Sequence, residues 1–325
     1  MAWYLGIDTS AYTTSVSVVD AIGNVVLDLR NLLEVAPGRR GLRQSEALFL
    51  HQKNLPQLFV QIDKEYFAGL KGIGVSSRPR PMKDSYMPVF LAGVSIAKII
   101  AAVLGVRLYE VSHQEGHIMA GIEPGHVLRR ETSFLGIHFS GGTSEILKIA
   151  MGAGTYFDIE LIGASADLHV GQLIDRIGVA MGLNFPAGPE LERLALKADG
   201  RNDKFLSSAV KDLRFSFSGA EAAALRMIEQ GYSKEEIAFC TLRMVANTLE
   251  KVLVNAQERT GLNKVLLVGG VMSNQIVKER LRDRLENAPR GFELYFAEPG
   301  LCGDNAVGTA RMAAVMAEIN ERGIV

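Results

Sequence analysis

The sequence is poor in cysteine, and this limits what its thiols can do. Only two of its 325 residues, Cys240 and Cys302, are cysteines. Two thiols are too few for a disulfide framework or for a thiolate zinc site, and they fit a reducing compartment. We therefore expect a cytoplasmic protein that depends on its apolar residues, 48% of the chain, for stability.

The chain also lacks a charge excess and a long apolar run. Its 35 Lys and Arg residues are balanced by 36 Asp and Glu residues, a net charge of −1. This balance excludes a globally basic nucleic-acid binder, so any RNA contact must come from local patches. No uncharged run approaches the roughly 18 residues of a membrane span. The first apolar run reaches Asp8 within a few residues, unlike a signal peptide.

Two common nucleotide-binding motifs are missing as well. The chain has neither a Gly-Lys-Ser/Thr motif nor a GxGxxG motif, which argues against a P-loop and a Rossmann domain. Glycine turns instead follow three predicted strands, at 6–10, 140–144 and 269–271. Such turns let backbone N–H groups approach phosphates, and a nearby helix N-terminus adds favourable charge. Three of them in one α/β chain favour a nucleotide cleft.

The apolar pattern predicts two similar halves, each a three-strand meander followed by helices and further strands. In the first half we expect strands at 3–8, 13–19, 25–29, 72–76 and 106–111, and helices at 45–68 and 91–104. In the second half we expect strands at 132–139, 144–150, 156–162, 265–268 and 293–297, and helices at 170–181, 190–198, 219–230, 233–259, 274–286 and 304–322. A boundary between the halves falls near residues 123–131.

Two histidines have the spacing of a metal site. His113 and His117 are four residues apart, so on a helix both imidazoles project from one face. A metalloprotease is disfavoured because Glu115 does not directly follow the first histidine. The spacing alone fits a solvated histidine pair equally well. Taken singly, Asp304 is best explained as the N-cap of the last helix, Asp175 as a surface charge, and 215–219 as an apolar loop with a Ser cap.

Taken together, these segments resemble one family. The motifs occur in the order Gly-Ile-Asp-Thr-Ser (6–10), Ser-His-Gln-Glu-Gly-His (112–117), Ser-Gly-Gly (140–142), Gly-Gln-Leu-Ile-Asp-Arg (171–176), Phe-Pro-Ala-Gly-Pro (185–189), Phe-Ser-Phe-Ser-Gly (215–219), Gly-Gly-Val-Met-Ser-Asn (269–274) and Cys-Gly-Asp-Asn (302–305). This order resembles the TsaD-type catalytic subunit of tRNA threonylcarbamoyladenosine synthase, once labelled glycoprotease or O-sialoglycoprotein endopeptidase.

The resemblance implies an α/β architecture, the actin/Hsp70-like ATPase fold. Two ribonuclease-H-like lobes, 1–125 and 126–325, would enclose a nucleotide cleft. The last helix, 304–322, would pack back across that cleft.

The resemblance also implies roles for particular residues. His113, His117 and Asp304 match the catalytic metal ligands, for iron or zinc, and two imidazoles plus one carboxylate leave open positions for a substrate. The positions that match a bound ATP, AMP or threonylcarbamoyl-AMP are Ser140, Gly141, Gly142, Gly269 and Gly270 near the phosphates, and Asp175, Gly188, Glu192 and Asn274 elsewhere on the nucleotide. Asp175 suits ribose hydroxyls as a charged acceptor.

The implied reaction transfers a threonylcarbamoyl group from threonylcarbamoyl-AMP to N6 of adenosine 37 of tRNA. The chain would therefore be an acyltransferase in tRNA processing, and protease activity is not expected. The implied partners are tRNA, an actin-fold subunit or a second copy of the chain, and a small P-loop ATPase, with no membrane partner.

Several positions depart from the family pattern and leave two alternatives open. Residues 11–14 carry no carboxylate, Thr143 replaces a histidine, and Leu168 replaces the second of two aspartates. A Gly-Pro-Gly loop is replaced by residues 77–84, Ser-Arg-Pro-Arg-Pro-Met-Lys-Asp. These changes suit a divergent paralog, a carbamoyl-type transferase with another acceptor. A non-catalytic actin-fold partner subunit is disfavoured because a scaffold needs no metal ligands.

Three short clusters of cations are candidates for RNA contact. They are Arg39, Arg40 and Arg43; Arg78, Arg80 and Lys83; and Arg129 and Arg130. Each could be a solvated basic turn. The second cluster lies in the replaced loop, between prolines that restrict the backbone, and we expect phosphate contacts there.

Overall fold

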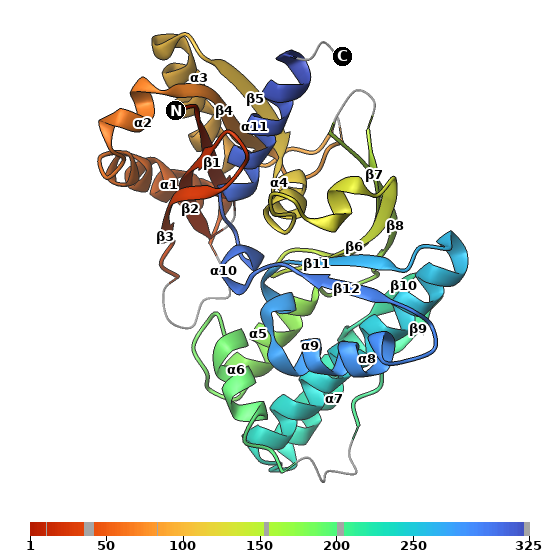
Figure 1. Ribbon diagram of the computed structural model, residues 1–325. Helices are drawn as coiled ribbons and strands as arrows, with labels where there is room; N and C mark the ends of the chain where they lie inside the picture. The colour runs from red at the N-terminus through yellow and green to blue at the C-terminus, as the bar shows by residue number, and fades with distance from the viewer. Residues whose placement is uncertain (11, 36–41, 83, 153–155, 200–204, 322–325) are drawn as a thin grey trace.

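The computed structural model describes residues 1–10, 12–35, 42–82, 84–152, 156–199 and 205–321. Two β-sheets, one built from each half of the chain, form its frame (Figure 1). None of the described helices combines the length and the apolar character that crossing a membrane requires.

The first sheet has five strands in the order β3-β2-β1-β4-β5. They are β1 (Trp3–Ser10), β2 (Thr13–Asp20), β3 (Val25–Leu32), β4 (Leu70–Arg78) and β5 (Arg107–Ser112). The first three form an antiparallel meander, and β4 and β5 run parallel to β1. Helices α1 (Gln44–Phe59) and α3 (Phe90–Leu104) pack on one face, where Leu5 and Ile7 join their core, and α2 (Lys64–Ala68) precedes β4.

The second sheet has seven strands in the order β12-β11-β6-β7-β8-β10-β9. They are β6 (Ser133–Phe139), β7 (Ser144–Met151), β8 (Phe157–Ser165), β9 (Ala209–Lys211), β10 (Arg214–Ser216), β11 (Lys264–Val268) and β12 (Glu293–Phe296). Odd-numbered residues of β6, such as Ile137 and Phe139, face the largest core. The helices that supply this core are α5 (Val170–Ala180), α6 (Gly188–Ala195), α7 (Ser218–Glu229), α8 (Lys234–Thr260) and α9 (Gln275–Leu281). Even-numbered Phe134 faces the other way, toward α4 (His113–Ala120).

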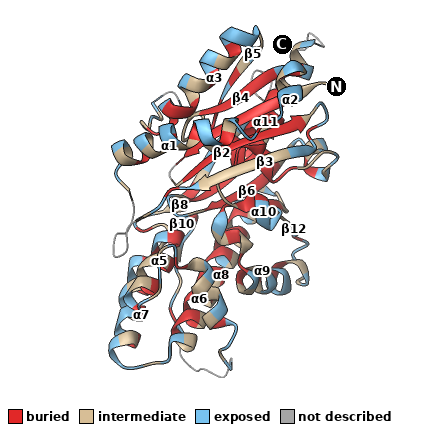
Figure 2. Cartoon of the chain, turned by 90° about the vertical axis from the view of Figure 1, so that its left-hand side faces the viewer, coloured by how far each residue is buried: buried red, intermediate tan, exposed pale blue. Residues whose placement is uncertain are grey.

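The last helix, α11 (Val307–Glu321), returns to the first sheet. Figure 1 shows it in blue among the red and orange elements, and it contacts β1, β4 and α4. Three glycines allow this approach, because a Cβ at Gly6, Gly74 or Gly308 would lie 2.1, 1.9 or 1.8 Å from a backbone oxygen of the facing segment. The helix thus covers the face of the sheet opposite α1 and α3. Figure 2 shows β1, β2 and β4 buried, whereas edge strand β3 is half-buried.

The predicted strands are present, but four predicted segments need correction. The helix expected over 45–68 is two helices, because Asp63 accepts the N–H of Glu65 and starts α2. The last helix begins at Val307 rather than at Asp304, because Asn305 accepts the Val307 N–H at 3.0 Å, and residue 322 lies outside the described residues. Residues 214–216 form β10 rather than a loop. The helix expected over 274–286 is α9 followed by a π-helical turn, Arg282–Glu286.

We expect Gly308→Ala to destabilise the fold strongly. The added methyl group would meet the Gly116 carbonyl oxygen at 1.8 Å, so α11 must shift away from α4. Overpacking of this kind typically costs about 1–3 kcal/mol, and the backbone contact places this case at about 3 kcal/mol. Urea unfolding measures the change. Gly300→Ala, in α10 (Pro299–Cys302) with no atom within 4 Å of the new methyl, is the control, and equal midpoints for the two variants would contradict the packing described.

Candidate metal centre and phosphate turn

Local sequence places both histidines on one face of α4. The hydroxyl of Ser112 accepts the N–H of Glu115, and the Glu115 carboxylate accepts the N–H of Ser112 at 2.7 Å. This capping box starts the helix at His113, directly after β5. His117 follows one turn later, and the two rings lie 4.4 Å apart. The pair thus lies on a helix, the arrangement in which its spacing directs both imidazoles to one face.

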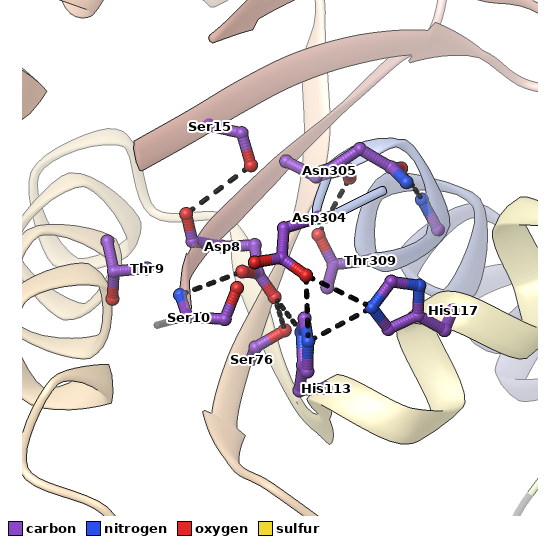
Figure 3. A network of polar contacts seen from close by, with 12 residues as sticks. Asp8, Thr9, Ser10, Ser15, Ser76, His113, His117, Asp304, Asn305 and Thr309 are labelled. Carbon is purple, nitrogen blue, oxygen red and sulfur yellow. Dashed lines mark hydrogen bonds and ion pairs between the residues drawn. The ribbon is translucent and has the colours of Figure 1, made fainter. Parts of the chain in front are cut away.

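Asp304 reaches this pair from the other end of the chain. Its Oδ1 lies 3.5 Å from His113 Nε2 and 3.3 Å from His117 Nε2, and the two Nε2 atoms are 3.1 Å apart (Figure 3). Among the described residues, these three offer ligand atoms within 4.8 Å of one another, as one ion requires. Tetrahedral zinc sites place their ligand atoms about 3.3 Å apart. The donor set therefore fits one divalent ion.

Asp8 holds the outer nitrogen of His113, a role that the sequence did not reveal. Its Oδ2 lies 2.8 Å from His113 Nδ1, and its other oxygen accepts the N–H of Ser10 at 2.9 Å (Figure 3). Metal-binding histidines commonly share their second nitrogen with a carboxylate, which fixes the ring. The signal in the sequence is a carboxylate that directly follows the apolar run 3–7 of β1.

The surrounding charges concentrate a positive charge on His113 in the metal-free protein. Burial acts to lower the pKa of His113, but the charge of Asp8 and hydrogen bonds with Asp304 and Asp8 raise it to about 10. Burial and the neighbouring His113 charge lower the pKa of His117. Burial acts to raise the pKa of Asp304, yet hydrogen bonds with both histidines hold it well below its usual value. The centre is therefore arranged for a cation between two carboxylates.

The predicted phosphate turn is an open hairpin between β6 and β7. The Ser140 N–H donates to the Thr143 carbonyl at 2.8 Å and closes the turn. Gly141 and Gly142 are exposed, and a Cβ on either would have no atom within 4 Å. Their backbone is thus accessible to a ligand.

Two further glycines press other segments against this hairpin. A Cβ on Gly171, at the start of α5, would lie 2.6 Å from the Gly141 Cα. Gly269 has a φ of +96°, and a Cβ there would lie 2.2 Å from the Phe139 carbonyl oxygen. Gly269 therefore serves close packing, while Gly270, with no atom within 4 Å of a Cβ, lies open beside it.

The remaining predicted nucleotide residues fix the loops around α6 and α9. Asp175 Oδ1 accepts the Ala187 N–H at 2.8 Å, directly before Gly188 starts α6. Glu192 accepts the N–H of Gln275 at 2.6 Å, and Asn274 caps α9 by accepting the N–H of Val277 at 3.1 Å. Burial raises the pKa of Asp175. These contacts give Asp175, Glu192 and Asn274 structural roles that the sequence did not show.

Contacts across the lobes join the histidine pair to the hairpin. Gln114, between the two histidines in sequence, donates to Glu145 at 2.7 Å, and Glu145 is almost fully buried just after the hairpin. His138, two residues before Ser140, lies with its ring 4.7 Å from the ring of His117. The candidate metal centre and the candidate phosphate turn are therefore neighbours.

The basic clusters are not all free cations. Arg80 forms an ion pair with the buried Glu145, and Arg78 lies at the end of β4, where it donates to the Ser77 hydroxyl at 3.2 Å. Arg129 donates to the Ile122 carbonyl oxygen at 3.1 Å. Lys83, Arg39 and Arg40 lie outside the described residues. Arg80 therefore neutralises Glu145, and the expected phosphate contacts of this cluster stay a prediction.

Comparison with known sequences identifies a family. The family model of tRNA N6-adenosine threonylcarbamoyltransferase matches residues 85–311. A tRNA N6-adenosine threonylcarbamoyltransferase of Archaeoglobus fulgidus is 31% identical over 316 residues, covering 96% of this chain and 90% of that protein. A probable bifunctional tRNA threonylcarbamoyladenosine biosynthesis protein of Methanothermobacter thermautotrophicus is 33% identical over 301 residues, 93% of this chain. The chain spans 53% of that bifunctional relative's length.

Solved structures identify the fold. A full-length HypF crystal structure matches 96% of this chain and 46% of its own, with a TM-score of 0.59 and 16% identity. Component A of (R)-2-hydroxyglutaryl-CoA dehydratase from Acidaminococcus fermentans covers 98% of this chain and all of its own, with a TM-score of 0.55 and 17% identity. A ROK family glucokinase from Streptomyces griseus covers 96% and 99%, with a TM-score of 0.53 and 12% identity. The expected α/β actin/Hsp70-like ATPase fold is confirmed.

We expect Asp8→Asn to lower the pKa of His113 by more than about one unit, because the variant removes the larger of the two charges that favour imidazolium. In the metal-free parent, protonated His113 stabilises the fold below its ordinary pKa of about 6.5, and this contribution is lost as the pH rises through about 10. In Asp8→Asn, where His113 has a lower pKa, this loss of stability with rising pH should be smaller. NMR titration of the metal-free protein measures the pKa. Glu110→Gln, an exposed change on β5, is the control, and an unchanged His113 titration in Asp8→Asn would contradict the assignment.

Proposed function

The chain belongs to the tRNA N6-adenosine threonylcarbamoyltransferase family of transferase enzymes, and on that premise we propose that it transfers a threonylcarbamoyl group from threonylcarbamoyl-AMP to N6 of adenosine 37 in tRNA. The observation that carries the proposal is the meeting of His113, His117 and Asp304 beside the Ser140–Thr143 hairpin. A metal centre next to a phosphate-binding turn is what transfer from an acyl adenylate needs.

His113, His117 and Asp304 would hold one iron or zinc ion through Nε2, Nε2 and a carboxylate oxygen. When bound, such an ion supplies Lewis-acid polarisation to a coordinated carbonyl or carboxylate group. Asp8 keeps the His113 ring in place through its Nδ1 atom. The three side chains leave further positions open to the substrate.

The hairpin and the loops around α6 would bind the adenylate. A Cβ at Gly141 or Gly142 would meet no protein atom within 4 Å, so a phosphate can approach this part of the backbone, where the Gly142 N–H donates to the Ser140 hydroxyl at 3.4 Å. The second carboxylate oxygen of Asp175 suits a ribose hydroxyl. In the reaction, the bond from N6 to the carbamoyl carbon forms, the bond from that carbon to the phosphate oxygen breaks, AMP leaves, and N6 releases one proton to solvent. The hairpin would stabilise the charge that develops on the departing AMP.

A second function, a carbamoyl-type transfer to another acceptor, is favoured by one observation. The segment that replaces the family's Gly-Pro-Gly loop is tied across the lobes by the Arg80–Glu145 ion pair, next to the proposed centre. We infer that this pair would restrict the path of an acceptor to the centre. The three ligands argue against a non-catalytic partner subunit. We further propose as partners an actin-fold subunit or a second copy of the chain, and a small P-loop ATPase. The reaction would take place in the cytoplasm.

A reconstituted assay distinguishes the two acceptors. The metal-loaded protein receives threonylcarbamoyl-AMP with either unmodified tRNA or a mixture of small amines, and mass spectrometry of products follows. We expect N6-threonylcarbamoyladenosine in tRNA, and its reduction by at least about 100-fold in His117→Ala, because a proposed ligand is lost. Modified small amines with unmodified tRNA would favour the second function. No product with any acceptor, with and without added partner subunits, would contradict transferase activity.

We expect Gly141→Val to abolish nucleotide binding without unfolding the protein. The valine side chain would fill the space over the hairpin that a phosphate must enter, yet the new Cβ meets no atom within 4 Å. Calorimetry with ATP and AMP measures the affinity, and we expect at least about a 100-fold loss, equal to two lost hydrogen bonds to a charged group. Gly219→Val, an equally open glycine in α7, is the control. Parent-like affinity in Gly141→Val would exclude the hairpin from the nucleotide site.

A further inference from the structure

His138 is a buried histidine whose ring packs against the ring of His117. It lies in β6, only 3% exposed, and neither ring nitrogen has a hydrogen-bond partner among the described residues. Strand alternation directs it to the same face as Phe134, toward α4, whereas Ile137 and Phe139 face the helical core. Buried polar atoms are rarely left unpaired, so this ring needs an explanation.

A second unpaired nitrogen lies in the neighbouring ring. His117 directs Nε2 toward Asp304 and His113, and its Nδ1 points away from them (Figure 3). That Nδ1 is buried and has no partner in the described part of the chain. The His117 and His138 rings are 4.7 Å apart and inclined at 48°. Two adjacent buried imidazoles thus carry three unsatisfied nitrogens.

The two ligand histidines differ in how their outer nitrogens are held. His113 has Nε2 in the centre and Nδ1 on the Asp8 carboxylate at 2.8 Å. His117 has the same inward nitrogen but lacks a carboxylate behind it. A metal on Nε2 requires the proton of a neutral imidazole to sit on Nδ1, where it needs an acceptor. The His138 ring packs against that of His117, but the two form no hydrogen bond in this structure, so His138 must turn its ring to accept this proton.

We propose that His138 is a positioning residue that accepts the Nδ1–H of His117 when a metal occupies Nε2. The proposal rests on the proposed metal centre and adds a residue to it. His138 is not one of the three residues whose ligand atoms lie within 4.8 Å of one another, so its place is behind the ligands. A neutral imidazole keeps the lone pair that acceptance requires.

The first test compares metal affinities. Competition with a chromophoric chelator gives the zinc affinity of the full chain and of His138→Phe, which keeps a ring but has no acceptor. We expect a 10- to 100-fold loss, the usual effect of removing an outer partner of a metal-binding histidine. His138→Gln, which restores an acceptor oxygen, should recover part of it. His126→Phe, a half-buried histidine that caps a turn elsewhere, should bind zinc like the parent.

The second measurement separates positioning from ligation and from simple misfolding. NMR of the zinc-loaded parent should show a hydrogen-bonded Hδ1 resonance from His117 that disappears in His138→Phe. X-ray absorption should count the same number of imidazoles in both. An unchanged affinity and Hδ1 signal in His138→Phe would overturn the proposal, and so would one imidazole fewer, which would make His138 a ligand. Failure of the parent to bind any divalent metal would instead contradict the proposed function.

Discussion

The site depends on the backbone-to-backbone packing of α11 against the first sheet and α4. Gly6, Gly74 and Gly308 remove the side chains that would keep this helix at an ordinary distance. Asp304 lies just before the helix, so the same packing holds its carboxylate opposite the two histidines of α4. Segments from the two ends of the chain thus build one centre, and neither half contains the whole of it.

Charge pairing explains why the centre tolerates burial. Burial acts to raise the pKa of Asp8 and of Asp304, but charge and hydrogen bonds from the histidines lower both, so both carboxyls are anionic at neutral pH. Two buried carboxylates require a cation, which the metal-free protein provides as the His113 imidazolium. A divalent ion in the same place would satisfy both carboxylates and release that proton. The two carboxylates suit metal binding because they already neutralise one positive charge, that of the His113 imidazolium.

Local signals were readable from the sequence, and long-range pairings were not. The spacing of His113 and His117 gave the face that they would share on a helix, and the capping box of Ser112 and Glu115 supplies that helix within four residues. The partnership of Asp8 with His113 joins residues 105 positions apart, and that of His138 with His117 depends on how the second sheet meets α4. The pairing of Arg80 with Glu145 could not be read from the sequence, because Glu145 lies 65 positions away in a strand of the other sheet. Asp304, taken singly, was expected to cap the last helix, whereas Asn305, one residue later, fills that role in the fold.

The most direct test of this account is to locate the metal in crystals of the zinc- or iron-loaded protein by anomalous scattering at the absorption edge. The account predicts one strong peak per chain, within about 2.3 Å of His113 Nε2, His117 Nε2 and an oxygen of Asp304. It also predicts that Asp8 stays on His113 Nδ1. A loaded protein with no peak between these side chains, or with its metal bound elsewhere, would contradict it.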